Sequence, residues 1–228
     1  MIRVLGSCSG DFRSFLEKEG RGLLERLGLD GDVVVLVYES AEELPEPFDD
    51  YFAVGQTTLV EPGGGRILVV EENWRLRDRE SWPSLLAQAL VEALVPPPSV
   101  PSWAAGWEEP YLAYKVLRNY QVHSLLAERR VLEAVADAKK VIGWILKEVS
   151  PFTPQLLSRG SCSLMLVIAT ALAAAWPYRE FDPDLASRIE RLLKSLPPRW
   201  RELLVKGLER GVGGLEKALK DLCERLRS

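Results

Sequence analysis

Hydrophobic positions in the first hundred residues alternate between short apolar runs and longer stretches with helical spacing. The short runs are bounded by glycine, proline and acidic residues, which is typical of strands joined by turns. They predict strands at Ile2–Leu5, Val33–Tyr38, Tyr51–Val54, Thr57–Val60 and Ile67–Glu71. Between the first two, apolar residues recur with helical period and predict a helix from about Asp11 to Leu27.

From residue 101 onward the pattern is almost wholly helical. Helices are predicted at Glu109–Arg129, Val131–Val149, Pro154–Trp176 with a break at Gly160, Pro183–Ser195, Pro198–Arg210 and Gly214–Leu226. The sequence therefore predicts an α+β fold, with a small mixed sheet and helices in residues 1–100 and an all-helical part in residues 101–228. These parts are either two subdomains or one continuous domain.

One stretch, Arg66–Val95, combines a strand, a charged turn and a helix. Ser81 is a candidate N-cap for the helix, and Pro83 suits its first turn. Three consecutive prolines after Val95 must end it. Within the helix, Ser84, Gln88 and Glu92 lie four residues apart and form a single polar stripe beside a broad apolar face.

Read from Leu85 to Leu94, this helix resembles the active-site helix of small zinc metallopeptidases of the gluzincin type, which carries HExxH after a strand. In that register Gln88 stands for the first histidine, Ala89 for the general-base glutamate and Glu92 for the second histidine. The resemblance also places the third ligand near Arg118 or Asn119, on a following helix. It covers about residues 50–130 and implies a metallopeptidase-like fold with a degenerate, inactive site, Gln88-Ala89-Leu90-Val91-Glu92.

The substitutions decide what such a site can do. A glutamine and an alanine cannot replace a zinc-binding imidazole and a general base. The chain has one histidine, His123, so any mechanism that needs two is excluded. We therefore expect no catalytic residue, metal or cofactor here, and a pseudo-site formed by Gln88, Ala89, Glu92, Arg118, Asn119 and His123. The simpler alternative is an amphipathic helix with a solvated polar stripe.

An ion pair could take the structural place of the missing metal. We hypothesise that Glu92 faces Lys115 or Arg118 on the next helix and ties the two helices together. His123 shares its helical row with Lys115 and Asn119, which is a poor set of metal ligands. A hydrogen-bonded or surface histidine is the expected alternative.

The loop Gly6–Asp11, between the first strand and helix, is a second candidate site. Its residues Ser7, Cys8, Ser9 and Gly10 could present backbone N–H groups to an anion, and a thiol near a helix N-terminus has a lowered pKa. The spacing from Cys8 to Arg13 differs from that of the tyrosine-phosphatase loop, and no GK[ST] follows. The alternative is a tight turn in which Ser9 or Asp11 caps the helix.

Composition narrows the function classes further. A net charge of −4 argues against a nucleic-acid partner. The longest apolar run, Leu164–Trp176, is short of the roughly 20 residues that span a bilayer, so no membrane role is expected. Three distant cysteines, Cys8, Cys162 and Cys223, imply no disulfide framework, and with the absence of a signal peptide they predict a cytoplasmic protein. Scarce amides with abundant charge predict a thermophilic source.

Three functional readings follow. The first is a non-catalytic, metallopeptidase-like protein that binds an unknown protein or peptide partner through the groove beneath the helix, where a peptidase binds its substrate. The second is an enzyme acting on a phosphorylated or thiol-reactive small molecule at Cys8. The third is a helical structural or assembly module whose contacts lie in Glu109–Ser228. The sequence leaves the oligomeric state open.

Overall fold

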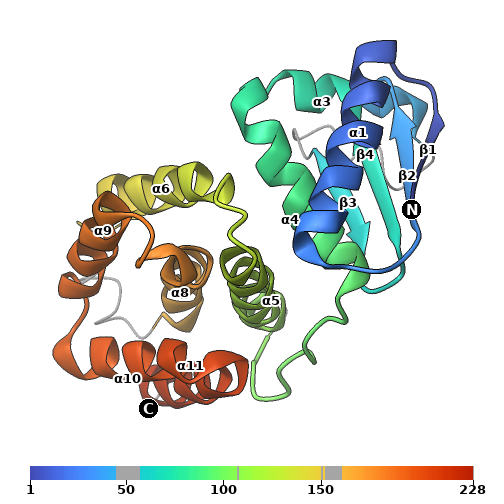
Figure 1. Ribbon diagram of the computed structural model, residues 1–228. Helices are drawn as coiled ribbons and strands as arrows, with labels where there is room; N and C mark the ends of the chain where they lie inside the picture. Colours follow the sequence, from blue (N-terminus) through green and yellow to red (C-terminus); the bar gives the residue numbers. More distant parts are fainter. Residues whose placement is uncertain (45–56, 107, 150, 152–160, 228) are drawn as a thin grey trace. The chain divides into compact units, whose positions relative to one another are not determined.

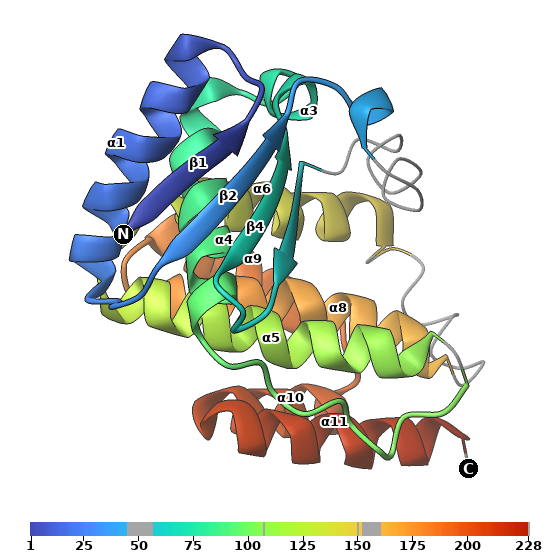
Figure 2. The same ribbon diagram turned by 90° about the vertical axis from the view of Figure 1, so that its right-hand side faces the viewer.

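A computed structural model describes residues 1–44, 57–106, 108–149, 151 and 161–227 (Figure 1). The fold is α+β, as predicted, with a four-stranded mixed sheet in the N-terminal half and helices elsewhere (Figures 1 and 2). The chain forms two compact units, Met1–Pro97 with Glu128–Ala134, and Pro98–Ala127 with Val135–Ser228. The short segment Glu128–Ala134 thus belongs to the first unit, although the residues on either side of it belong to the second.

The sheet consists of β1 (Ile2–Gly6), β2 (Val33–Tyr38), β3 (Thr58–Glu61) and β4 (Arg66–Val70). Its strand order is β1-β2-β4-β3, as Figure 2 shows, with β1, β2 and β4 parallel and β3 antiparallel at one edge. Four predicted strands are confirmed, and the fifth, Tyr51–Val54, lies outside the described residues. Glu71, which the apolar pattern assigns to the last strand, instead begins a helix.

Helices α1 (Gly10–Leu27) and α4 (Trp82–Leu94) pack on one face of this sheet and against each other. Side chains alternate between faces along a strand, so Val33, Val35 and Val37 of β2 are buried beneath them. The short helix α3 (Glu71–Arg75) and a 3₁₀ turn (Arg79–Ser81) lead from β4 into α4. Four aromatic rings fill the space between these helices: Phe12, Phe15, Trp74 and Trp82.

The turn from β1 into α1 depends on a glycine and a serine. Gly6 has φ +101°, and a Cβ there would lie 2.1 Å from the carbonyl oxygen of Val37, so only glycine fits. Ser9 is the N-cap of α1, since its hydroxyl accepts the amide of Phe12 at 3.4 Å. The predicted capping role of Ser9 is confirmed.

The second unit is built from six helices of the described chain with short 3₁₀ and π turns between some of them. They are α5 (Glu109–Glu128), α6 (Ala134–Trp144) with a π turn (Ile145–Val149), α8 (Cys162–Ala175) with a 3₁₀ turn (Trp176–Tyr178), α9 (Pro183–Lys194), α10 (Pro198–Glu209) and α11 (Gly211–Arg227). Helix α6 begins three residues later than predicted, after Arg130 adopts φ +55°. Ser161 caps α8 by accepting the amide of Leu164 at 3.2 Å, while Gly160 itself lies outside the described residues.

Helix α8 contains the longest apolar run of the sequence and lies in the core of this unit. Ten of its residues are buried, among them Leu166, Ile168 and Leu172. Within the described residues, no helix has the length and apolar content that crossing a membrane requires. The apolar run is therefore accounted for by burial among the neighbouring helices.

The cysteines differ from the sequence-based expectation. Cys162, at the start of α8, and Cys223, in α11, form a disulfide that spans 61 residues of sequence. Both side chains are buried, at 3% and 0% exposure. The expectation of no disulfide is wrong, because the packing of α11 against α8 brings together two cysteines whose spacing gives no sign of it.

Candidate functional site

Helix α4 holds the three positions that the metallopeptidase resemblance singles out. Ser84 is fully buried, and its hydroxyl accepts a hydrogen bond from the Gln88 side-chain amide at 3.0 Å. Ala89 is 4% exposed and faces the core, while Gln88 and Glu92 are half-buried. The predicted polar stripe therefore begins inside the protein, and one of its members is already bonded to another.

The two ends of α4 are fixed differently from the sequence-based expectation. Ser81 occupies the N-cap position, but its side chain does not cap the helix: it has helical backbone angles, φ −85° and ψ −13°, and its hydroxyl donates to the Asp78 carbonyl at 2.7 Å. At the other end, the Gly63 and Gly65 amides donate to the carbonyls of Glu92 and Ala93, at 3.1 and 2.9 Å. The hairpin before β4 thus satisfies carbonyls that a helix end leaves free.

At the three positions that the resemblance singles out, α4 carries an amide, a methyl group and a carboxylate. In the peptidase register imidazoles bind the zinc and a glutamate acts as the general base. Gln88 and Ala89 do not supply these groups at their positions, and the Glu92 carboxylate stands in the place of the second imidazole. Over the parts of the chain that the structure describes, no group of three or more His, Cys, Asp or Glu side chains could hold a metal ion.

The remaining pseudo-site residues lie on α5. Arg118 is 3% exposed, and its Nη1 donates to the Gln121 side chain at 2.7 Å. Asn119 is half-buried, and Lys115 is exposed, with its ammonium 5.6 Å from the centre of the Tyr111 ring. Helices α4 and α5 belong to different units, so the ion pair between Glu92 and Lys115 or Arg118 stays a prediction.

His123 is a buried, hydrogen-bonded histidine. Its Nδ1 lies 3.1 Å from the Tyr178 hydroxyl, and the two rings meet edge to face with centroids 5.7 Å apart. Burial lowers the pKa of His123 to about 4. The imidazole is therefore neutral near pH 7 and helps to hold α5 against the turn after α8, which confirms the hydrogen-bonded alternative.

The loop between β1 and α1 lies at the carboxyl ends of the parallel strands, where open α/β sheets usually bind ligands. Here the protein supplies its own anion. Glu71, 5% exposed at the end of β4, accepts the Ser9 amide at 2.8 Å and the Ser9 hydroxyl at 2.5 Å. Arg75 donates to Glu71 at 2.5 Å and to Asp11 at 3.1 Å. The Ser9 amide, the expected anion donor, is thus used inside the protein.

This network determines the charge of its members. Burial alone would raise the pKa of the Glu71 carboxyl, but hydrogen bonds from Ser9 and Arg75 outweigh it and hold that pKa below its ordinary value. The Ser9 hydroxyl likewise lowers the pKa of Asp11. Neither Glu71 nor Arg75 is suggested by the sequence pattern, because their contacts with Ser9 span more than sixty residues.

Cys8 is a free, half-buried thiol beside this network. Burial raises the pKa of the Cys8 thiol, and the opposing effect of the Arg13 guanidinium does not cancel it. The expectation of a lowered thiol pKa is therefore wrong.

The cavity beside Cys8 has a volume of about 470 Å³. It is lined by Cys8, Ser9, Glu39, Glu71, Glu72, Arg75 and Leu76. Three of the four charged residues that line it are acidic, which is unfavourable for a phosphorylated ligand. Ser7 is exposed, and Gly10 is the first residue of α1.

Arg13 has a role that the phosphatase comparison does not suggest. Its Nη1 donates to the Val4 carbonyl at 2.7 Å and its Nη2 to the Gly6 carbonyl at 2.8 Å. Because β1 is an edge strand whose intervening residues bond to β2, these carbonyls point away from the sheet. The guanidinium therefore covers the open edge of β1.

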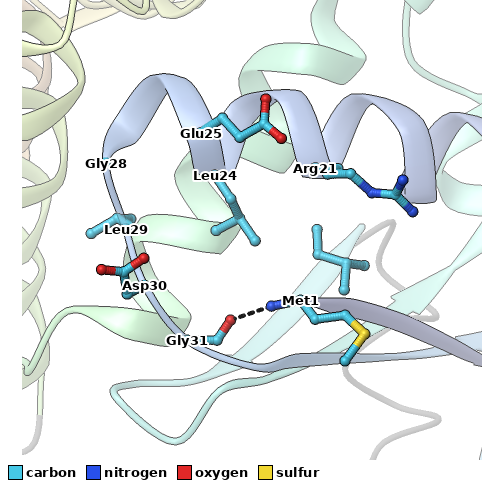
Figure 3. A pocket seen from close by; sticks show the side chains of 9 residues that line it. Met1, Arg21, Leu24, Glu25, Gly28, Leu29, Asp30 and Gly31 are labelled. Atoms are coloured by element: carbon cyan, nitrogen blue, oxygen red, sulfur yellow. Dashed lines mark hydrogen bonds between the residues drawn. The ribbon is translucent and has the colours of Figure 1, made fainter.

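Figure 3 shows a hollow at the opposite, amino ends of the strands, about 310 Å³ in volume. The Met1 ammonium there donates to the Gly31 carbonyl at 2.5 Å. The charged side chains around it, including Arg21 and Glu25, are exposed. We place no site there.

Comparison of the chain with protein-family models, curated proteins and solved structures finds no match.

Proposed function

We propose that this protein is a non-catalytic, metallopeptidase-like protein that acts by binding another molecule. The observation that carries the proposal is the content of α4. A strand, a short connection and an amphipathic helix follow one another as the resemblance requires, yet the helix carries Gln88, Ala89 and Glu92 at the chemical positions. An antiparallel strand at one edge of an otherwise parallel sheet is compatible with this reading.

A binding role is favoured over catalysis by the second candidate site as well. The loop at Cys8 is engaged with Glu71 and Arg75, and its thiol is protonated near pH 7. We therefore rank a small-molecule enzyme below a binding protein. A cytoplasmic location remains part of the proposal, since intracellular proteins of hyperthermophiles also contain disulfides such as Cys162–Cys223.

The absence of catalysis can be tested on the native protein. We expect no stoichiometric zinc by metal mass spectrometry and no hydrolysis of a fluorogenic peptide library in zinc-buffered solution. Hydrolysis that a chelator abolishes and added zinc restores would overturn the proposal.

The resemblance itself can be tested by rebuilding the metal ligands. The pair Gln88→His and Glu92→His restores two imidazoles four residues apart, and Asn119→Glu adds an acid at the expected position of the third ligand. Since catalytic zinc sites use three protein ligands, adding Asn119→Glu should tighten zinc binding about tenfold or more. A matched control places the same pair at Lys220 and Glu224, an exposed i, i+4 pair on α11.

In the control background, Asn119→Glu should leave zinc affinity unchanged. Equal affinity of the α4 pair with and without Asn119→Glu would contradict the metallopeptidase-like arrangement. Circular dichroism and thermal unfolding of each variant would establish that the helices are retained.

A further inference from the structure

The sheet of the first unit has one face that the described helices do not cover. Parallel strands are normally buried on both faces, and β1, β2 and β4 are parallel. Helices α1 and α4 pack on one face only. On the other, Leu5 is 50% exposed, and Leu36, Tyr38 and Leu68 are half-buried. We call these four residues the open apolar face.

The open apolar face is hollowed beside the ends of β1 and β2. A cleft of about 330 Å³ is lined by Leu5, Gly6, Ser7, Leu36, Val37, Tyr38 and Glu43. Towards β3 the same face is closed by a 3₁₀ turn (Ala41–Glu43) and Leu44, which packs with Val70, Tyr38 and Leu68. The cleft is therefore bounded on one side by a turn that carries acidic side chains.

These acidic side chains give the cleft its charge. Glu39, Glu42 and Glu43 are exposed, and no Lys or Arg among the described residues forms an ion pair with them. The first unit as a whole has 20 acidic and 11 basic residues, a net charge of −9. On the open face, the basic side chain of Arg3 lies near the other end of β1. An occupant of the cleft should therefore be cationic.

The form of the occupant follows from the edge of the sheet. Strand addition at β1 would need the outward carbonyls of Val4 and Gly6, and Arg13 already bonds both. Beside the cleft, the part of the sheet that the described residues leave accessible is therefore its face, and a sheet face is ordinarily covered by helices. We propose that the open apolar face and its acidic rim bind a basic amphipathic helix of a partner protein. This inference rests on the binding role proposed above, but not on the resemblance to metallopeptidases.

The probe is a fluorescent synthetic peptide of about 14 residues, built from Leu and Lys with helical amphipathic spacing. Its counterpart carries Glu in place of Lys. Anisotropy titrations with the full-length protein should show saturable binding of the Lys peptide, weakened by salt, and no binding of the Glu peptide. Binding of both peptides, or of neither, overturns the proposal.

Three variants separate the cleft from general attraction to an acidic unit. Leu5→Asp should weaken binding about tenfold, because the exposed Leu5 side chain is the apolar anchor. Glu43→Lys should weaken it about threefold, as expected for a rim charge. The control, Glu25→Lys, makes the same charge change on an exposed position of α1 and should change affinity less than about twofold.

Equal weakening by Glu43→Lys and Glu25→Lys, or an unchanged affinity for Leu5→Asp, would overturn the assignment of the cleft. The peptidase assay and the peptide-binding titration can fail independently of each other. A zinc-dependent peptidase activity defeats the proposed function, whereas failed peptide binding defeats the docking surface and leaves the non-catalytic reading in place.

Discussion

The burial of His123 makes the stability of this protein depend on pH in a defined window. The pKa is 6.5 for an ordinary histidine and about 4 in the folded protein. On acidification the unfolded chain therefore binds the proton first, and stability falls as the pH drops below about 6.5. The difference between the two pKa values corresponds to about 3 kcal/mol in full, of which about 2 kcal/mol should be lost between about pH 7.5 and pH 5.

Between about pH 7.5 and pH 5, the change in stability is expected to come from one residue. His123 is the only histidine of the chain, and unperturbed carboxyl groups titrate near or below pH 4.3. Carboxylates with lowered pKa, such as Glu71, lose their stabilising contribution at still lower pH, as the pH falls through their folded pKa. A stability slope between neutrality and pH 5 is therefore assigned to the imidazole.

Urea unfolding, followed by tryptophan fluorescence at a series of pH values, measures this slope. His123→Asn keeps a polar group near the Tyr178 hydroxyl and should remove most of the slope. The single imidazole also allows its pKa to be measured directly from ring proton signals in NMR spectra. A titration midpoint near 6.5, or an identical slope in the variant, would refute the reasoning.

Three other predictions concern the cysteines and the sheet edge. Reduction of the disulfide between Cys162 and Cys223 should lower the free energy of unfolding by about 4 kcal/mol, from the entropy of a loop of 61 residues, whereas Cys8→Ser should leave it nearly unchanged. Alkylation of Cys8 by iodoacetamide, followed by mass spectrometry, should have its pH midpoint above that of a cysteine-containing peptide, because burial raises the thiol pKa, and a lower midpoint would contradict this. Arg13→Ala should cost about 1–3 kcal/mol and promote self-association visible by light scattering, since it exposes two strand carbonyls, and a variant that stays as monodisperse as the native protein would argue against edge protection.

Much of the fold could be predicted because the local signals are strong. The β-branched run Val33–Tyr38 and the helical period of Asp11–Leu27 each permit one structure, and the apolar pattern identifies both within about a residue. Ser9 was recognisable as a cap because it directly precedes the periodic segment. Ser81 was not excluded by the same rule, although the 3₁₀ turn before α4 gives it helical backbone angles.

The candidate site was less predictable, since its determining contacts are long-range. Glu71 is at the end of an apolar run, and only the sheet order brings it to Ser9. The pairing of Cys162 with Cys223 depends on how α11 packs against α8. The spacing of apolar residues within each helix does not show which helices pack together. The sequence shows that α4 lacks the histidines and the glutamate of a zinc site. It does not show that the Gln88 side chain donates a hydrogen bond to Ser84.

The disulfide also determines what a protease can do to this molecule. Helices α9 and α10 and the turns that flank them lie in sequence between the two bonded cysteines. A single cut anywhere in that interval leaves both fragments covalently joined, so the nicked chain migrates as two bands only after reduction. The last helix, α11, thus stays attached to α8 after the backbone between them has been broken. Limited proteolysis under non-reducing conditions would consequently underestimate how accessible this part of the chain is.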